Sequence, residues 1–359
     1  MSNGRYDNNF YRSLNRRQHT LRSRKKRRLA IILTLVIILC AIWAVAIFWL
    51  SFLWKDGKTT IPSDTTDPVS TDPIEEETSG IVTDPVTTDP AGINYITLEL
   101  AKTKLHEGDL ILVNSDFPFV FPTNHEATLK PIYGNKNQNY QVSRSDHKIR
   151  ADLIEILNTM FTEFADLSGK KDVHIYSAYR SLDQQKDIYD YNVEKYGVEE
   201  ASLYVALPGN SEHHIGTAID VNIYSSVDKK MYNLPDLPGY DWVTENFHRY
   251  GFILRYPEDK IGHTGIGYEP WHFRYVGVPH ATIMKEKNYC LEEYTAFLRN
   301  YPFSGEHFTY EVDGTRYEIY YVPLAEDENA KTEVPIPADL EYTLSGNNID
   351  GYIVTMTLK

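Results

Sequence analysis

The sequence predicts an α+β protein whose folded part is preceded by one transmembrane helix and followed by a small β-rich extension. Three observations lead to this prediction. Residues 29–54 hold no charged side chain, residues 93–300 alternate between helix-like and strand-like patterns, and residues 301–359 contain paired strand patterns around tight turns. With 359 residues, of which 42% are apolar, the chain can bury a sizeable core, which excludes a disordered protein.

The N-terminal region carries the signals of a membrane anchor. Residues 1–28 contain ten Lys or Arg and a single acid, Asp7, although the whole chain has a formal net charge of −14. The following 26 uncharged residues exceed the about 20 that span a bilayer, and no small-residue cleavage site comes after them. Because Lys and Arg stay on the cytoplasmic side of such a span, we predict a cytoplasmic tail, an uncleaved anchor over residues 29–54 and an extracytoplasmic remainder. A nucleic-acid partner is not expected.

Residues 55–92 have the composition of a spacer. Thr, Asp and Pro dominate, and the tripeptide Thr-Asp-Pro begins at Thr66, Thr71, Thr83 and Thr88. Proline restricts itself and the preceding residue to extended conformations, and the acids repel one another. We predict a disordered, semi-stiff spacer with a reach on the order of 100 Å, which would carry the folded part into a cell wall, expected to be of the Gram-positive type.

The first half of the folded part alternates between strand and helix patterns. Residues 109–114 form a short apolar run that predicts a strand, and residues 146–168 show apolar side chains at helical spacing that ends before Gly169. Residues 172–179 alternate like a strand, and residues 182–196 have the pattern of a second helix.

The second half contains a predicted strand with two polar residues on one face. Residues 218–224 alternate, so Asp220 and Asn222 share one face of a predicted strand. Three further elements are predicted in this half: a helix over residues 240–250 and strands over residues 251–256 and 272–276.

The last sixty residues change in character. Strand patterns at 308–312 and 315–322 flank Asp313-Gly314, a strong hairpin signal, and those at 341–344 and 352–358 flank a second turn. They form either a small β appendage or extra strands packed on the preceding domain, and the sequence does not decide between these.

Cysteine usage is sparse. Cys40 lies in the predicted anchor and Cys290 in the exported part, so a disulfide framework within that part is excluded. Cys290 is expected to be a buried, small apolar residue.

Two segments carry the candidate chemistry. The first spans residues 209–220, and the second has the sequence Glu-Pro-Trp-His and ends at His272. Together His213, Asp220 and His272 offer two imidazoles and a carboxylate, the three-ligand set that a catalytic Zn²⁺ takes when its fourth position is kept for water. Glu269 is then free to act as a base.

Longer motifs surround these residues: Ser211-x-His213-x-x-Gly216-x-Ala218-x-Asp220, Glu269-Pro270-Trp271-His272, Ser177-Ala178-Tyr179-Arg180-Ser181, Tyr250 to Pro257 and Arg274-Tyr275-Val276-Gly277. In these motifs, residues 110–298 resemble the VanY-type D-alanyl-D-alanine carboxypeptidases, part of a zinc peptidase group that includes L,D-carboxypeptidases and VanX dipeptidases. The resemblance implies one Zn²⁺ per site, held by His213, Asp220 and His272. It also implies that Glu269 is the general base and that Arg180 binds substrate.

The same resemblance implies a fold. It predicts a compact carboxypeptidase domain, which we assign to residues 93–300, with a central antiparallel sheet and flanking helices. The tail, the anchor, the spacer and the extension over residues 301–359 lie outside it.

Four residues near the motifs have two interpretations or a lesser role. Arg180 either grips a substrate carboxylate with its planar fork of donors or forms a structural salt bridge. Ser211 either bonds the peptide or caps the turn before the ligand. Gln185 either touches substrate or is an exposed helix residue, and His214 is expected to point away from the metal.

These observations predict a membrane-anchored, extracytoplasmic zinc carboxypeptidase that removes the terminal D-alanine from peptidoglycan stem peptides. Within the enzyme class, the alternative is an L,D-carboxypeptidase acting on tetrapeptides, because no sequence feature reveals the chirality accepted at the penultimate residue. From another class, the alternative is an inactive cell-wall-binding module. The presence of all three ligands and the base argues against the latter.

Overall fold

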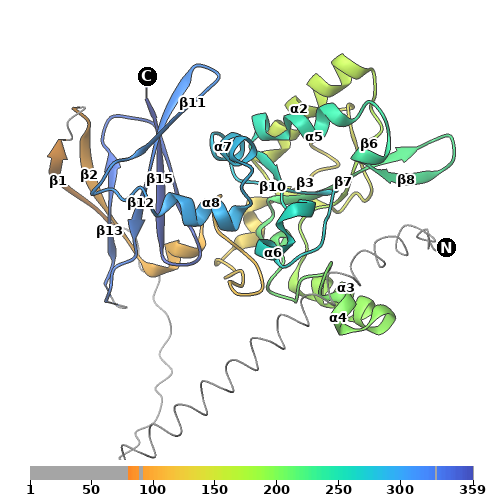
Figure 1. Ribbon diagram of the computed structural model, residues 1–359, viewed down its shortest axis with the longest axis horizontal. Coiled ribbons are helices and arrows are strands. Elements are labelled where there is room, and N and C mark those ends of the chain that lie inside the picture. The colour runs from red at the N-terminus through yellow and green to blue at the C-terminus, as the bar shows by residue number, and fades with distance from the viewer. Residues whose placement is uncertain (1–79, 89–91, 328–329, 359) are drawn as a thin grey trace, which may run out of the picture. The chain divides into compact units, whose positions relative to one another are not determined.

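The computed structural model describes residues 80–88, 92–327 and 330–358 (Figure 1). Within these ranges the chain is a mixed α+β protein, as predicted. The predicted cytoplasmic tail and the anchor over residues 29–54 lie outside the described residues, as does most of the predicted spacer. None of the helices in the described ranges has the length and apolarity that a membrane crossing requires.

A six-stranded sheet forms the centre of the part that carries the candidate motifs. Its order is β4-β6-β7-β10-β9, with β8 paired to the C-terminal half of β7. Every pair is antiparallel except β4 with β6, so the implied antiparallel sheet is confirmed apart from this short parallel edge. The strands are β4 (Gln141–Val142), β6 (Val173–Ser177), β7 (Ala218–Ser225), β8 (Lys230–Asn233), β9 (Phe252–Leu254) and β10 (His272–Tyr275).

Helix α2 (Leu153–Ser168) packs its apolar side against this sheet. Its buried residues join those of β6 and β7 in one core cluster, and Gly169 ends the helix in the left-handed conformation with φ 72°. The predicted start at residue 146 was wrong. Residues 148–150 form strand β5 (Lys148–Arg150), which pairs with β3 (Leu129–Pro131), so their backbone groups are already used when the helix begins.

Helix α3 (Leu182–Tyr196) has the predicted bounds. A capping box between Ser181 and Gln184 starts it, and Gln185 is its only buried residue. The remaining helical elements are short: α4 (Val198–Ala201), α5 (Asp241–Asn246), α6 (Ile261–Thr264), α7 (His280–Lys287), α8 (Leu291–Leu298), η1 (Lys102–His106), η2 (His125–Thr128), η3 (Glu212–Ile215), η4 (Leu234–Asp236), η5 (Phe247–Tyr250) and η6 (Glu258–Lys260). The predicted helix over residues 240–250 is thus divided between α5 and η5.

The C-terminal strands take part in two further sheets. One has the order β11-β12-β15-β14, and the other, β1-β2-β13, joins the first two described strands to β13. The predicted hairpin is confirmed, with Asp313 and Gly314 at φ 50° and 76° in its turn. The strands are β1 (Gly80–Thr88), β2 (Asn94–Leu100), β11 (Phe308–Val312), β12 (Thr315–Pro323), β13 (Thr332–Pro337), β14 (Tyr342–Gly346) and β15 (Gly351–Leu358).

These strands pack on the rest of the folded part rather than standing apart from it. Ile319 and Ile353 share a buried cluster with Val276 and with Leu291 of α8, and Figure 1 shows β12 and β15 beside α8. Cys290, at the start of α8, is buried as expected, and burial raises the pKa of its thiol to about 12. Of the two arrangements left open by the sequence, the structure therefore has the packed one.

The predicted boundaries at residues 93 and 301 differ from the structure. Residues 80–88, assigned to the disordered spacer, form β1 and pair with β2. In turn β2, at the start of the predicted carboxypeptidase domain, pairs with β13 from the extension. Strand pairing joins segments far apart in sequence, and no local pattern reveals it.

The predicted strand over residues 109–114 was wrong. This segment is irregular, and its carbonyl groups accept hydrogen bonds from side chains rather than from a neighbouring strand. Arg274 donates from Nη2 to the carbonyl oxygens of Asp109 and Ile111, at 3.0 and 3.1 Å. Because the backbone groups are satisfied in this way, an apolar run is buried here without joining a sheet.

Candidate metal centre and active site

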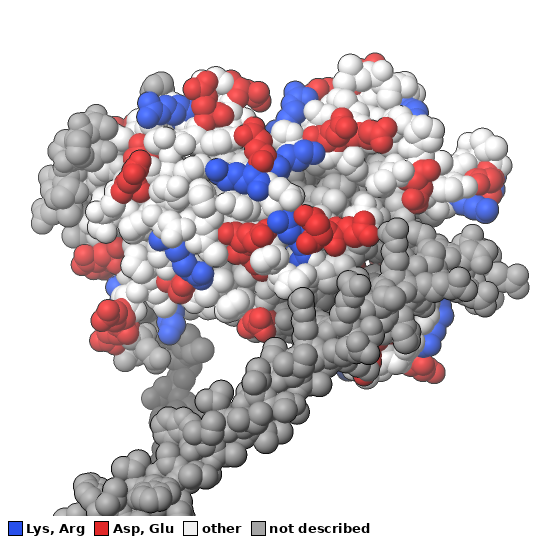
Figure 2. Space-filling view, in the orientation of Figure 1, with Lys and Arg blue, Asp and Glu red and all other residues white. Residues whose placement is uncertain are grey.

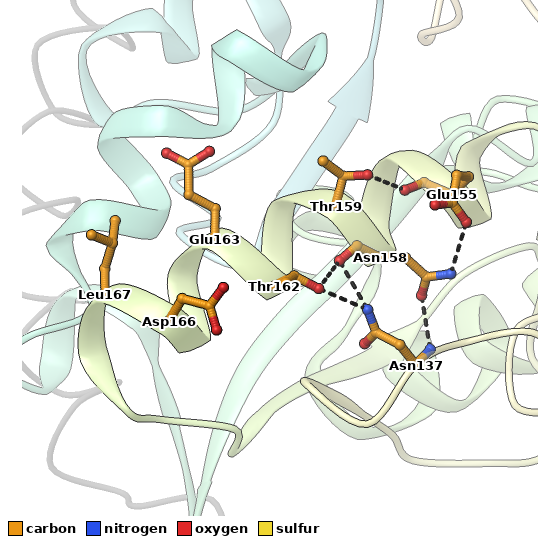
Figure 3. Close-up of a pocket in the computed structure, with 8 residues that line it drawn as sticks. All are labelled: Asn137, Glu155, Asn158, Thr159, Thr162, Glu163, Asp166 and Leu167. Carbon is orange, nitrogen blue, oxygen red and sulfur yellow. Dashed lines mark hydrogen bonds between the residues drawn. The ribbon is translucent and has the colours of Figure 1, made fainter.

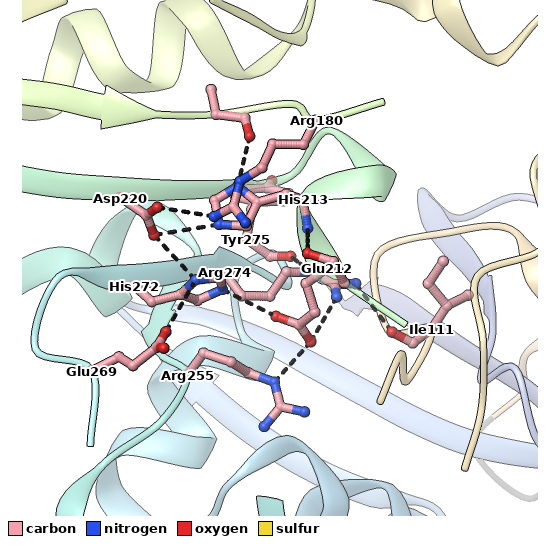
Figure 4. A network of polar contacts seen from close by, with 12 residues as sticks. Ile111, Arg180, Glu212, His213, Asp220, Arg255, Glu269, His272, Arg274 and Tyr275 are labelled. Carbon is pink, nitrogen blue, oxygen red and sulfur yellow. Dashed lines mark hydrogen bonds and ion pairs between the residues drawn. The ribbon is translucent and has the colours of Figure 1, made fainter. Parts of the chain in front are cut away.

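The three predicted ligands converge at the centre of the six-stranded sheet. His213 comes from η3, whereas Asp220 and His272 are direct partners in the antiparallel register of β7 and β10. All three side chains are buried, and one ligand atom from each lies within 4.8 Å of the others. Figure 4 shows both imidazoles directed at the Asp220 carboxylate.

The spacing of these atoms fits a zinc ion. Oδ1 of Asp220 lies 3.3 Å from Nε2 of His213 and 3.2 Å from Nδ1 of His272. Ligand atoms about 2.0 to 2.1 Å from a tetrahedral ion are roughly 3.3 Å apart. Nε2 of His213 and Oδ1 of Asp220 are also buried without a hydrogen-bond partner, which a metal would supply. The donor set and its spacing therefore suit Zn²⁺.

Burial and mutual contact shift the pKa values of the ligands. Burial and the charge of Arg180 lower the pKa of His213 to about 4. Burial alone would raise the pKa of Asp220, but contacts with His213, His272 and Arg180 hold it well below its usual range. Burial would lower the pKa of His272, whereas its acceptors Asp220 and Glu212 raise it to about 9.

Glu269 is placed beside the ligands without joining them. Its Oε2 lies 3.7 Å from Nδ1 of His272, and its backbone N–H donates to the carbonyl of Tyr256 at 3.1 Å. The side chain is 6% exposed, and this burial, with the nearby charge of Asp220, raises the pKa of Glu269 to about 8 despite the opposing effect of His272. A carboxyl group in this position is suited to taking up and releasing a proton.

Arg180 forms the structural ion pair that was one of its two interpretations. Its Nη2 lies 3.1 Å from Oδ2 of Asp220, the carboxylate oxygen that faces away from the imidazoles, and its Nε donates to Ser177. A guanidinium has five N–H donors, of which the protein uses three, and the side chain is still 18% exposed. Arg180 can therefore orient the ligand and still bind a substrate carboxylate.

Gln185 is neither free nor exposed. Its side-chain oxygen accepts from Nη1 of Arg180 at 2.9 Å, and its amide nitrogen donates to the carbonyl of Ala206 at 2.8 Å. Gln185 therefore holds Arg180 in place, and the interpretation as an exposed helix residue was wrong.

Ser211 and His214 both support the local backbone. The hydroxyl of Ser211 accepts from the His213 N–H at 3.4 Å and caps η3, in keeping with the capping interpretation. His214 lies outside the ligand triad, as expected, and both of its ring nitrogens contact backbone groups of Arg180 and Gly209.

Sequence reasoning missed three charged residues beside the site. Glu212, Arg255 and Arg274 are each at most 1% exposed and form ion pairs behind His272. Each stands inside a motif that carries the family resemblance, but only as a neighbour of the residues with expected roles. The available signal was a charged residue within or directly after an apolar strand pattern, which applies to Arg274 and Arg255 but not to Glu212.

A hollow elsewhere on the described surface holds none of these groups. It lies on α2 and is lined by polar side chains, among them Asn137, Asn158 and Thr162, which bond one another (Figure 3). Of its three acids, Glu155 and Glu163 are engaged by neighbouring side chains, and Asp166 is the third. We assign no chemistry to it.

The residues of this site lie in a segment that matches a known family. The family described as VanY, D-alanyl-D-alanine carboxypeptidase, matches residues 146–278, which include all three ligands. A D-alanyl-D-alanine carboxypeptidase of Enterococcus faecium is 37% identical over 267 residues, covering 72% of this chain and 78% of the relative. The chain belongs to the VanY family.

Other relatives extend the likeness. The bifunctional D-Ala-D-Ala dipeptidase and D-Ala-D-Ala carboxypeptidase VanXYC of Enterococcus gallinarum is 42% identical over 131 residues, covering 36% of this VanY-family chain and 69% of the relative. The crystal structure of the vancomycin resistance D,D-dipeptidase VanXYg, in complex with a D-Ala-D-Ala phosphinate analogue, is 35% identical. It superposes with a TM-score of 0.63 and covers 73% of this chain and 98% of that structure.

Family and site together define the class of enzyme. This VanY-family protein is a zinc hydrolase. Among the described residues, His213, Asp220 and His272 form the group that could hold the ion. The recognition from sequence and the zinc cofactor are confirmed.

Proposed function

We propose that this protein removes the terminal D-alanine from peptidoglycan stem peptides outside the cell. The observation that carries this proposal is the convergence of the ligand triad, Glu269 and Arg180 at one site. A carboxypeptidase needs a group that binds the free C-terminal carboxylate close to the group that moves the proton, and these two residues supply them.

Arg180 positions the substrate. Its fork of donors pairs with the C-terminal carboxylate and so places the last peptide bond against the metal centre. Acidic and basic side chains are interspersed on the face shown in Figure 2, and the whole chain carries a net charge of −14. Attraction of an anionic substrate therefore depends on the local charges of Arg180 and zinc rather than on long-range steering.

Glu269 moves the proton of the reaction. When bound, zinc acidifies water and polarises the scissile carbonyl group. Glu269 removes a proton from the attacking water as the new C–O bond forms, and it delivers that proton to the amide nitrogen as the C–N bond breaks. The products are a shortened peptide with a new carboxylate and free D-alanine.

The location of this activity follows from the N-terminal sequence. Ten basic residues followed by the uncharged run at residues 29–54 support a single-pass anchor with a cytoplasmic N-terminus. A Thr/Asp/Pro-rich segment then leads to the folded part, which under this proposal works in the cell wall, where its substrate is.

The direct test compares peptide substrates. The full-length, zinc-loaded protein is incubated with a pentapeptide ending in D-Ala-D-Ala and with the corresponding tetrapeptide, and the products are identified by mass spectrometry. We expect loss of one alanine from the pentapeptide only. Cleavage of the tetrapeptide alone would assign the protein as an L,D-carboxypeptidase. If neither peptide were cleaved, the protein would be a wall-binding module.

A further inference from the structure

Three buried charged side chains, Glu212, Arg255 and Arg274, lie beside His272 (Figure 4), and the partly exposed Glu292 completes a cluster of four. Glu212 comes from η3, Arg255 follows β9, Arg274 lies on β10, and Glu292 lies in α8. Two carboxylates and two guanidinium groups balance one another, so the cluster is neutral without any added ion. Removing charged groups from water is costly unless each is well paired. A functional role would explain why the protein keeps charged residues at these positions.

The two carboxylate oxygens of Glu212 have different surroundings. Oε1 lies 2.7 Å from Nε of Arg255 and 3.1 Å from Nη1 of Arg274. Oε2 has no hydrogen-bond partner and lies 3.6 Å from Nε2 of His272, which is also buried without one. An acceptor and a ring nitrogen, both otherwise unsatisfied, thus face each other at 3.6 Å, which is beyond the 2.7 to 3.2 Å of an N–H···O bond but close enough to form one after a small shift of either side chain.

The other ring nitrogen of His272 faces the metal side. Its Nδ1 is 3.2 Å from Oδ1 of Asp220 and 3.7 Å from Glu269. A neutral imidazole carries one N–H, and a carboxylate at Nε2 favours the tautomer with the proton on that nitrogen. The lone pair of Nδ1 is then available to a metal ion.

We propose that Glu212 is a positioning residue that holds His272 with its Nε2–H directed at the carboxylate and its Nδ1 directed at the metal. This inference rests on the metal centre of the proposed function. His213 has the opposite arrangement, because its Nδ1 contacts the carbonyl oxygen of Ala178 at 2.6 Å and its Nε2 faces Asp220. The two imidazoles therefore bind through different ring nitrogens, each selected by its acceptor.

Arg255 and Arg274 fix the position of Glu212. Arg255 donates to both oxygens of Glu292, at 2.9 and 2.7 Å, which ties it to the first turn of α8. Arg274 is held by carbonyl oxygens of the irregular segment over residues 109–113. Both arginines are therefore anchored on elements outside the central sheet, and Glu212 has one orientation in which to meet His272.

The first test measures zinc affinity in the full-length protein by competition with a chromophoric chelator. Glu212→Gln keeps the shape of the side chain but removes the carboxylate, and we expect zinc affinity to fall about 10- to 100-fold. Glu318→Gln is the matched control, because it also removes a buried carboxylate that contacts a histidine, His307, but it lies on β12 and touches neither the cluster nor a ligand. Its affinity should change less than about threefold. Unchanged affinity in Glu212→Gln, or an equal loss in both variants, would overturn the proposal.

A second measurement needs no variant and so remains decisive if Glu212→Gln does not fold. Nuclear magnetic resonance of isotope-labelled histidine in the zinc-loaded protein reports which ring nitrogen carries the proton. We expect Nε2–H for His272 and Nδ1–H for His213, and the reverse assignment for His272 would refute the role of Glu212. Neither measurement reads peptide cleavage. A protein with the expected tautomers that releases no D-alanine would refute the proposed function and leave this inference standing.

Discussion

Asp220 and His272 stand directly opposite each other in the antiparallel pair β7 and β10. Side chains at such positions are on the same face of the sheet, about 4.5 to 5.5 Å apart at Cβ. The sheet itself therefore sets the spacing of two of the three candidate zinc ligands. The neighbouring pair of Ile219 and Phe273, both fully buried, holds this register, because a slip of one strand by one residue would put Asp220 and His272 on opposite faces.

Removal of zinc should destabilise the protein. The metal binds the folded site and not the unfolded chain, so free zinc at about 100 times its dissociation constant adds about 2.7 kcal/mol to the free energy of unfolding. We expect a lower melting temperature in chelator and full recovery when zinc is restored. His213→Ala should melt at the same temperature with and without zinc. Equal melting of the unsubstituted protein in chelator and in zinc would contradict the assignment of the triad.

Substitution of Arg180 should weaken transition-state binding. Arg180→Ala leaves a substrate carboxylate without its partner, and we expect transition-state binding to weaken by about 2 to 4 kcal/mol. This corresponds to a fall in kcat/KM of roughly 30- to 1,000-fold. Arg180→Lys keeps the charge but loses the fork of donors and should recover only part of this loss. Because Arg180 also contacts Asp220, the zinc content of each variant must be measured alongside its kinetics. A loss below threefold at full zinc occupancy would remove Arg180 from the site.

Gln185 offers a related prediction with a smaller effect. It bonds Arg180 and Ala206 and is fully buried, so its amide group is not accessible to substrate. Gln185→Ala should therefore raise KM through a mobile Arg180, by about tenfold, and should leave zinc binding unchanged. An effect on zinc affinity as large as that on KM would show that Gln185 supports the metal centre instead.

The stability of the protein should fall in mild acid because of His280. This residue is buried, contacts the hydroxyls of Tyr294 and Thr355, and burial lowers its pKa from 6.5 to about 3. Between these two pH values the unfolded chain binds a proton that the folded protein does not, so stability decreases as pH falls below 6.5. At pH 4.5, two units below the unfolded value, the loss should be about 2.7 kcal/mol. Chemical unfolding of His280→Gln should lack this part of the pH dependence, and an unchanged profile would contradict the prediction.

The C-terminal strands should be needed for the stability of the whole folded part. Ile319 on β12 is fully buried in a cluster with Val276 and Leu291, so Ile319→Ala should cost about 2 to 5 kcal/mol. Val227→Ala is the control, since Val227 is 93% exposed and its loss should cost under about 0.5 kcal/mol. A separate unfolding step for the C-terminal strands, with the rest unaffected, would show that they are an independent appendage.

The candidate ligands could be predicted from sequence because their spacing reflects local geometry. The alternation over residues 218–224 places Asp220 on a strand face, and the short segment from Glu269 to His272 carries the base and a ligand. Helix α3 was predictable for a similar reason, since its capping box and its length are local features.

The features that escaped prediction depend on contacts between distant residues. Glu212 and Arg255 are 43 residues apart, and nothing near either residue indicates the pair. The burial of residues 109–113 without a strand depends on Arg274, more than 160 residues later. The pairing of β2 with β13 is equally non-local, and it crosses the boundary predicted at residue 301.

In the proposed reaction, Glu269 moves the proton during zinc-dependent release of D-alanine. The most direct measurement is the rate of D-alanine release from a pentapeptide by the zinc-loaded protein and by Glu269→Gln, with zinc content determined for both. We predict full zinc occupancy in each and a rate at least about 10²-fold lower in the variant, because glutamine cannot accept the proton. An unchanged rate in zinc-replete Glu269→Gln would contradict this account.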